Sequence, residues 1–127
     1  MSLVVLVLIF QTACSEGQNN TGNILSPEQV SHELDKGGIT LLDVRTPSEW
    51  DEGVIEGALL KNFYDDDFVS SLSTIDKAQT VIVTCKRGGR SAEAVVIMQK
   101  AGFKEVYDME AGMDGWNEER RPTVQPE

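Results

Sequence analysis

The sequence predicts an α/β fold, with a mostly parallel central sheet of about five short strands flanked by helices. Three observations lead to this prediction. Short runs rich in valine, isoleucine and leucine alternate along the chain with segments whose apolar residues recur at helical spacing. The runs are nearly continuous in apolar residues, as expected for parallel strands covered on both faces. A chain of 127 residues, 40% of them hydrophobic, has room for one domain with a modest core.

The first half of the domain should contain two helices and two strands. A capping-box pattern with proline at the first helical position predicts a helix that begins after Ser26 and ends at the glycine pair 37–38. Residues 39–44 form the next apolar run and are expected to be a strand. A second capping pattern predicts a short helix over residues 47–50, and residues 58–60 suit a short strand.

The second half should contain three helices and two strands. Three aspartates precede a predicted helix over residues 68–72, where acidic side chains are favourable at the positive end of the helix dipole. The β-branched run at 80–84 predicts a buried strand, and residues 91–101 carry apolar side chains at helical spacing. A small strand at 105–108 and a helix or turn at 112–118 complete the domain.

One segment, between the predicted strand at 80–84 and the helix that follows it, combines a thiol, three cations and two glycines. It reads Cys85-Lys86-Arg87-Gly88-Gly89-Arg90-Ser91. The carboxyl end of a strand and the amino end of a helix are where open α/β sheets bind ligands and where unpaired N–H groups favour anions. A thiol in such a field is stabilised as the thiolate, and glycines let the backbone approach a bound group closely. We interpret the segment as an anion-binding loop with Cys85 as nucleophile; the alternative is a structural cysteine at the end of a buried strand.

The charge balance limits the class of partner. With 11 basic and 21 acidic residues, the formal net charge is −10, which disfavours nucleic acid and anionic membrane surfaces as main partners. Three of the 11 basic residues nonetheless lie within residues 86–90, so the local field of the loop has to recruit any anionic substrate. No group of cysteine and histidine has metal-ligand spacing, and we expect neither a metal nor another cofactor.

The amino-terminal residues have the pattern of an export signal. The apolar run at 3–10 is too short to span a bilayer, which needs ~20 apolar residues, but it fits the hydrophobic region of a secretory leader. Small residues directly before Cys14 are similar to the lipobox of bacterial lipoproteins, in which the leader is cut before a cysteine that is then lipidated. Gln11 departs from that pattern, which prefers an aliphatic residue there, and no Lys or Arg precedes the apolar run.

The chain should therefore have three segments: a leader at 1–14, a flexible tether rich in serine, asparagine and glycine at 15–23, and a folded domain at 24–127. The leader would place the protein in the cell envelope or periplasm, with a lipid anchor at Cys14 as its contact with the membrane. A different export signal and a cytoplasmic extension without leader function are the alternatives. We expect the protein to be a monomer.

Five short motifs between residues 24 and 122 resemble, in the same order, those of the single-domain rhodaneses, a family of sulfurtransferases. They are Leu42-Asp43-Val44-Arg45 followed by Glu49-Trp50, then Gly53 to Ala58, the loop Cys85 to Ser91, Ala101-Gly102-Phe103, and Ala111-Gly112 before Trp116. The third of these matches the CxxGxR pattern of the family's active-site loop. The sequence departs from the family at three scaffold positions, with Val54 in place of a histidine, Glu56 in place of a proline and Ala111 in place of a glycine.

The resemblance implies a rhodanese-like fold and a two-step transfer of sulfane sulfur through a covalent intermediate. The Cys85 thiolate would take the outer sulfur of a small anionic donor, thiosulfate or a persulfide, and a small acceptor, a thiol or cyanide, would then remove it. Backbone N–H groups of the loop would hold the terminal sulfur of the Cys85 persulfide, and the three cations would attract and orient the donor. The implied substrate-binding residues are Lys86, Arg87, Gly88, Gly89, Arg90 and Ser91.

Asp43, Arg45 and Glu49 form a second set, which we expect to support the loop. Asp43 ends a strand that should neighbour the strand of Cys85, so it could help to orient the loop. Arg45 has Glu49 four residues downstream, and the predicted ion pair between them would fix the connection to the short helix. A direct catalytic role for Asp43 or Arg45 is the alternative.

Two other functions stay open at this point. Cysteine phosphatases and arsenate reductases also use a thiolate in an anion-binding loop, but they need a wider loop than the four residues that separate Cys85 from Arg90. A regulatory binding module, or a persulfide carrier that depends on a partner protein, would share the fold without the full reaction.

Overall fold

The computed structural model describes residues 23–127. The predicted leader, with Cys14, and all but the last residue of the predicted tether lie outside the described residues. Five strands form one parallel sheet in the order β1-β5-β4-β2-β3, which confirms the predicted fold class. The strands are β1 (Ile24–Leu25), β2 (Ile39–Asp43), β3 (Leu59–Leu60), β4 (Thr80–Thr84) and β5 (Val106–Met109).

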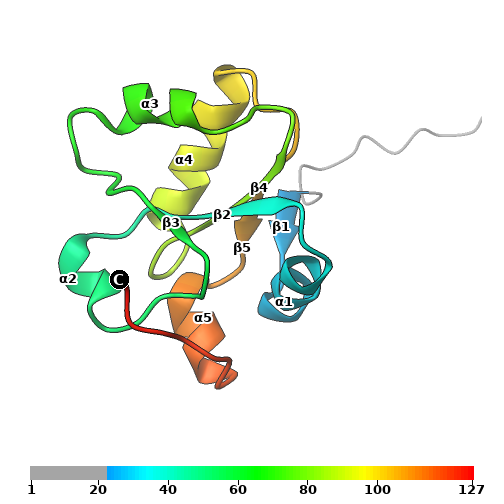
Figure 1. The fold of residues 1–127 in the computed structure, drawn as a ribbon, viewed down its shortest axis with the longest axis vertical. Coiled ribbons are helices and arrows are strands. Elements are labelled where there is room, and N and C mark those ends of the chain that lie inside the picture. The colour runs from blue at the N-terminus through cyan, green and yellow to red at the C-terminus, as the bar shows by residue number, and fades with distance from the viewer. Residues whose placement is uncertain (1–22) are drawn as a thin grey trace, which may run out of the picture.

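Helices cover both faces of this sheet, as Figure 1 shows. Among the residues described, no helix is long and apolar enough to cross a membrane. The helices are α1 (Pro27–Lys36), α2 (Pro47–Trp50), α3 (Phe68–Ser71), which continues as the 3-10 turn η2 (Leu72–Thr74), α4 (Gly89–Lys100) and α5 (Gly112–Glu118).

The predicted helix caps form in α1 and α2 but not in α3. In α1 the Ser26 hydroxyl accepts the N–H of Gln29 at 3.2 Å, and the Gln29 side chain accepts the N–H of Ser26 at 2.9 Å. Asp67 occupies the cap position of α3, but its side chain makes no capping hydrogen bond. Strand β1 was not predicted, because two residues are too short a run to give a strand pattern.

The core has two parts, one on each face of the sheet. Alternate residues of β4 point to opposite faces, so Val81, Val83 and Cys85 lie in the part covered by α3 and α4. Ile82 lies in the other part, between the sheet, α1 and α5. Cys85 therefore directly follows a strand that is packed on both faces.

The chain order places a crevice at the carboxyl ends of β2 and β4. After β2 the chain moves outward to β3, and after β4 it moves the other way to β5. Ligands of open α/β sheets bind at such a reversal, between the loops that leave the two strands. Here these loops carry Arg45 and Glu49 after β2, and Cys85 to Ser91 after β4.

Candidate active site

The Cys85 sulfur lies between a backbone N–H and a buried hydroxyl. The Gly88 N–H donates to the sulfur at 3.0 Å, and the Ser91 hydroxyl oxygen lies 3.2 Å from it. Gly88 is left-handed, with φ 115°, at the position directly before α4, and this turn brings its N–H back onto the sulfur. The thiol is thus seated against the amino end of α4, as predicted, with only 1% of the residue exposed.

Helix α5 holds the other side of the loop. The N–H of Met113 donates to the Cys85 carbonyl at 2.8 Å, and the N–H of Asp114 donates to the Lys86 carbonyl at 2.9 Å. Because the C=O and N–H of a trans peptide unit point in opposite directions, the N–H groups of Lys86 and Arg87 point away from α5. Helix α5 therefore engages two loop carbonyls, and the N–H groups of the same two peptide units are left on the side away from α5.

The three predicted cations of the loop each face a carboxylate. Lys86 Nζ lies 3.4 Å and Arg87 Nε 3.0 Å from the carboxylate of Asp114 on α5. These hydrogen bonds, that of Arg87 first, hold the pKa of Asp114 below its ordinary value. Arg90 points across the crevice to Glu49 and also lies over the ring of Tyr64, 5.6 Å from its centroid.

Glu49 and Arg90 form a two-bond ion pair, Nη1 to Oε1 at 2.7 Å and Nη2 to Oε2 at 2.9 Å. Hydrogen bonding from Arg90 lowers the pKa of Glu49 from 4.5 to about 2, with a further contribution from Thr46. The same bonds raise the pKa of Arg90 above its usual range. Both side chains are less than one-fifth exposed, so the pair connects α2 to the start of α4 in a mostly covered position.

The predicted ion pair between Arg45 and Glu49 does not form. Arg45 instead binds Asp43 through two nitrogens of its guanidinium group, Nε to Oδ1 at 3.0 Å and Nη2 to Oδ2 at 2.8 Å. Both residues are buried. The guanidinium also donates to the backbone carbonyls of Glu49 and Gly53. The i,i+4 rule fails here because Arg45 lies in the bend between β2 and α2 and not on a helix.

These contacts link the supporting residues into one network. The buried Asp43–Arg45 pair fixes the backbone of the β2 loop, that loop presents Glu49, and Glu49 holds Arg90. The hydrogen bonds of the Arg45 guanidinium go to Asp43 and to the carbonyls of Glu49 and Gly53, and a supporting role for Asp43, Arg45 and Glu49 stays a prediction.

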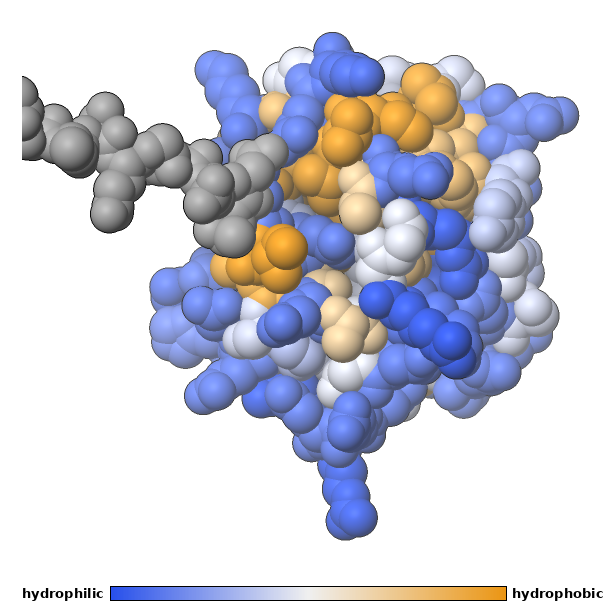
Figure 2. Space-filling model, turned by 180° about the vertical axis from the view of Figure 1, so that it is seen from behind, coloured by the Kyte–Doolittle hydropathy of each residue, from blue (hydrophilic) through white to orange (hydrophobic). Residues whose placement is uncertain are grey.

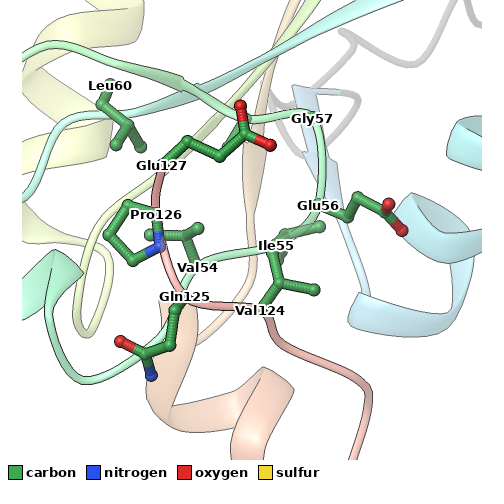
Figure 3. A pocket seen from close by; sticks show the side chains of 10 residues that line it. Val54, Ile55, Glu56, Gly57, Leu60, Val124, Gln125, Pro126 and Glu127 are labelled. Atoms are coloured by element: carbon green, nitrogen blue, oxygen red, sulfur yellow. The ribbon is translucent and has the colours of Figure 1, made fainter.

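One hollow of the described structure lies away from the Cys85 loop. It measures about 580 Å³ and lies between residues 54–57 and the carboxyl-terminal segment, which run side by side through the Val54–Val124 bridge (Figure 3). No residue of the Cys85 loop lines it, and its charged lining residues are Glu56 and Glu127. Such a lining repels anions. The chemistry of this chain is therefore expected at the loop and not in this hollow.

The sequence did not reveal two residues of the site, Asp114 and Tyr64, which contact the loop cations. Each lies far along the chain from the loop residues that it contacts, so no local sequence pattern indicates the contact. Within residues 23–127, no group of three or more His, Cys, Asp or Glu side chains is arranged to hold a metal ion.

Comparison with known proteins gives one consistent result. The Rhodanese-like domain family matches residues 26–119. The chain is 34% identical over 106 residues to the probable adenylyltransferase/sulfurtransferase MoeZ of Mycobacterium tuberculosis, covering 81% of this chain but only 26% of that protein. It is 33% identical over 104 residues to thiosulfate sulfurtransferase 16, chloroplastic, of Arabidopsis thaliana, covering 74% of this chain and 87% of that protein.

Among solved structures, a rhodanese-related protein from Thermoplasma volcanium superposes with a TM-score of 0.74 at 25% identity. The match covers 82% of this chain and 99% of that one. The chain spans about a quarter of the mycobacterial relative and most of the other two proteins.

Proposed function

The chain belongs to the rhodanese-like domain family, and on that premise we propose that it is a sulfurtransferase that works through a persulfide on Cys85. Relatives named as sulfurtransferases, one of them with thiosulfate in its name, support this class of activity. The proposal rests on the surroundings of the Cys85 sulfur. The sulfur accepts a hydrogen bond from the Gly88 N–H and lies in contact with the Ser91 hydroxyl.

The reaction takes two displacements at sulfur. The Cys85 thiolate attacks the outer sulfur of thiosulfate, the bond between the two sulfurs of thiosulfate breaks, and sulfite leaves with the electron pair. The product is a Cys85 persulfide anion. Cyanide or a thiolate then attacks the terminal sulfur, which leaves as thiocyanate or as a new persulfide, and the Cys85 thiolate is restored.

The loop suits the charge that this intermediate carries. Donors near the sulfur stabilise the thiolate before attack, and the N–H groups of Lys86 and Arg87, turned away from α5, are available to the terminal sulfur anion after it. Lys86 and Arg87 are 44% and 79% exposed at the mouth of the loop, where they attract an anionic donor despite the net charge of −10.

The position of Arg90 disfavours the phosphatase alternative. A phosphatase of this type needs its loop arginine free to bind two oxygens of the phosphoryl group. In this chain both terminal nitrogens of the Arg90 guanidinium donate hydrogen bonds to the Glu49 carboxylate. Together with the short distance in sequence from Cys85 to Arg90, this favours a sulfur anion over a phosphate.

Two measurements on the same preparation test the proposal. Thiosulfate and cyanide should yield thiocyanate, and mass spectrometry after thiosulfate alone should show one added sulfur on the Cys85 peptide. Cys85→Ser should lose both while its circular dichroism and melting curve stay unchanged. Hydrolysis of a phosphoryl ester without thiocyanate formation would contradict the proposal.

The same experiment separates an enzyme from a carrier. A persulfide that forms on Cys85 but is not removed by cyanide or small thiols would identify a carrier that passes its sulfur to a partner protein. Rapid loss of the added sulfur to small thiols, with thiol persulfide as product, is the result expected for the enzyme.

A further inference from the structure

An exposed tyrosine beside the Cys85 loop has no role in the reaction described above. Tyr64 lies in the segment between β3 and α3, and 66% of the residue is exposed. The guanidinium carbon of Arg90 lies over its ring, 5.6 Å from the ring centroid. Arg90 directly precedes Ser91, whose hydroxyl oxygen lies 3.2 Å from the Cys85 sulfur. The ring is therefore next to the site, and most of its surface is open to solvent.

Hydrogen bonds hold the segment that carries Tyr64. The N–H of Phe63 donates to the carbonyl of Val44, directly after β2, at 3.1 Å. The N–H of Tyr64 donates to the Asn62 side chain at 3.0 Å, and the same side chain donates to Asp65 at 3.2 Å. The backbone position of Tyr64 is thus set before any ligand binds, which lowers the cost of binding one.

Two further aromatic rings connect Tyr64 to the core. Phe63 meets Tyr64 edge to face, with the ring centroids 5.8 Å apart, and its ring lies 5.2 Å from that of Phe68. Phe63 packs against the part of the core that contains both Phe68 and Cys85. The row of aromatic rings therefore runs from solvent to the apolar cluster to which the nucleophile itself belongs.

The cations that attract the donor are positioned by a different part of the sheet. Lys86 and Arg87 pair with Asp114 of α5, the helix that follows β5. Tyr64 follows β3, and β5 and β3 lie on opposite sides of β4 in the strand order. The Cys85 loop thus has a cationic flank and an aromatic flank, which suit an anionic ligand and an apolar one.

Arg90 is already held without Tyr64. Both terminal nitrogens of its guanidinium donate to the Glu49 carboxylate, at 2.7 and 2.9 Å. A cation–π contact at an exposed position adds little to such a pair. Support of Arg90 therefore does not account for an aromatic ring at this position.

We propose that Tyr64 selects the sulfur acceptor: its exposed ring binds the apolar body of an organic thiol, best an aromatic one, while that thiol attacks the Cys85 persulfide. The inference rests on the proposed function, because it concerns the second displacement of that reaction. In this step the thiolate bonds to the terminal sulfur, the bond from that sulfur to Cys85 breaks, and the electron pair stays on the Cys85 sulfur. Cyanide has no apolar body, so the ring gives it no advantage.

The second displacement can be measured alone, on protein whose Cys85 has been loaded with one sulfur by polysulfide. Mass spectrometry of the Cys85 peptide follows the added sulfur, so Cys14 does not contribute. Its removal is timed with benzyl mercaptan, 2-mercaptoethanol or cyanide. Tyr64→Ala should lower the rate constant for benzyl mercaptan roughly threefold to tenfold and leave the other two unchanged.

Two further variants serve as controls. Tyr64→Phe keeps the ring and should keep the wild-type rate constant for benzyl mercaptan. Apolar side chains also gather in patches on the back of the molecule (Figure 2), so exposure alone does not identify a site. Val96→Ala removes such a side chain, 47% exposed on α4 and outside the Cys85 loop, and should change none of the three rate constants.

The outcomes separate acceptor selection from a supporting role. An equal fall for all three acceptors in Tyr64→Ala would mean that Tyr64 supports the loop, and the proposal would be overturned. An unchanged rate constant for benzyl mercaptan, or a loss in Tyr64→Phe as large as in Tyr64→Ala, would also overturn it. Because polysulfide supplies the sulfur, a failure of thiosulfate to load Cys85 would contradict the proposed donor and leave this measurement intact.

Discussion

The carboxylate of Glu49 and the guanidinium of Arg90 meet through two hydrogen bonds, at 2.7 and 2.9 Å, although they are 41 positions apart in the chain. The pair crosses the crevice between the β2 loop and the β4 loop. It therefore joins the two segments whose relative position defines the site, and it occupies the arginine that a wider anion-binding loop would direct at its ligand.

We expect Glu49→Gln to weaken this link without changing the volume of the side chain. Because the pair is partly exposed, the loss should be about 1–2 kcal/mol in the free energy of unfolding. The rate of thiocyanate formation should fall as well, because Arg90 is no longer held and the start of α4 is less well ordered. Urea denaturation and the transfer assay measure the two effects, and Glu52→Gln, an exposed residue of the same loop, is the control. A variant as stable and as active as the control would contradict the prediction.

The stability of the protein should depend on pH through the ionisation of the Glu49 carboxyl. Its pKa is lowered from 4.5 to about 2, chiefly by hydrogen bonding from Arg90. A carboxyl with a depressed pKa contributes stability that is complete above the ordinary value and is lost as the pH falls through the folded-state value. The difference in unfolding free energy between the wild type and Glu49→Gln should thus be constant above about pH 5, decrease below it and disappear only below the folded-state pKa of about 2. A difference that did not decrease between about pH 5 and about pH 2 would show that the ion pair is not its source.

Asp114 limits the attraction of the loop for anions, since it pairs with both Lys86 and Arg87. Asp114→Asn should release this positive charge and lower the KM for thiosulfate roughly twofold to fivefold at low ionic strength, with a smaller effect in high salt. Glu118→Gln removes the same charge from an exposed position on α5 and should change KM little. A rise in KM for Asp114→Asn would mean that Asp114 is needed to hold the cations in place.

Among the residues expected to position the loop, the buried pair of Asp43 and Arg45 should be the most sensitive to substitution. Arg45→Met leaves the Asp43 carboxylate buried without its partner, which costs about 3–5 kcal/mol in comparable cases. The double variant with Asp43→Asn removes the unpaired charge and should recover part of this loss, as judged by the urea midpoint. If the double variant were no more stable than Arg45→Met alone, the loss would come from the Glu49 and Gly53 carbonyls that Arg45 binds.

The fold was largely predictable from the sequence because its main elements depend on local patterns. The apolar runs of β2 and β4 and the capping box of α1 fall where they were expected. The loop at Cys85 was found for the same reason, since its glycines, cations and thiol are adjacent in sequence. The two-residue β1 was missed, because its formation depends on pairing with β5 and not on its own residues.

The partners of the charged residues were not predictable in the same way. Arg45 and Glu49 have the spacing of a helical ion pair, but each binds a different residue, Asp43 and Arg90. Charged side chains pair with whatever the fold brings near, and here the sheet brings together loops that are far apart in the chain. The pairing of Lys86 and Arg87 with the single carboxylate of Asp114 is a further case, and it lowers by one the positive charge that the sequence alone assigns to the loop.

The last prediction concerns the contact between α5 and the loop, where two adjacent residues should respond in opposite directions. Gly112 has φ +52°, and a Cβ there would lie 2.4 Å from the Cys85 carbonyl oxygen and 2.6 Å from that of Lys86. Since both are backbone atoms, Gly112→Ala should displace α5 from the loop, with a loss of roughly 2–4 kcal/mol and most of the transfer activity. The N–H groups of Met113 and Asp114 would then no longer hold the two carbonyls.

Ala111 is the counterpart, a non-glycine residue with φ +58° at an exposed position. Ala111→Gly relieves the strain of the left-handed conformation, which is on the order of 1 kcal/mol, against a smaller entropic cost in the unfolded chain. Thermal unfolding should give a higher Tm for Ala111→Gly and a much lower one for Gly112→Ala. The two residues are adjacent, and both substitutions change a single methyl group. Tm changes of opposite sign would therefore show that the close approach of α5 to the loop carbonyls causes the loss in Gly112→Ala. An equal loss of Tm in both variants would refute this explanation.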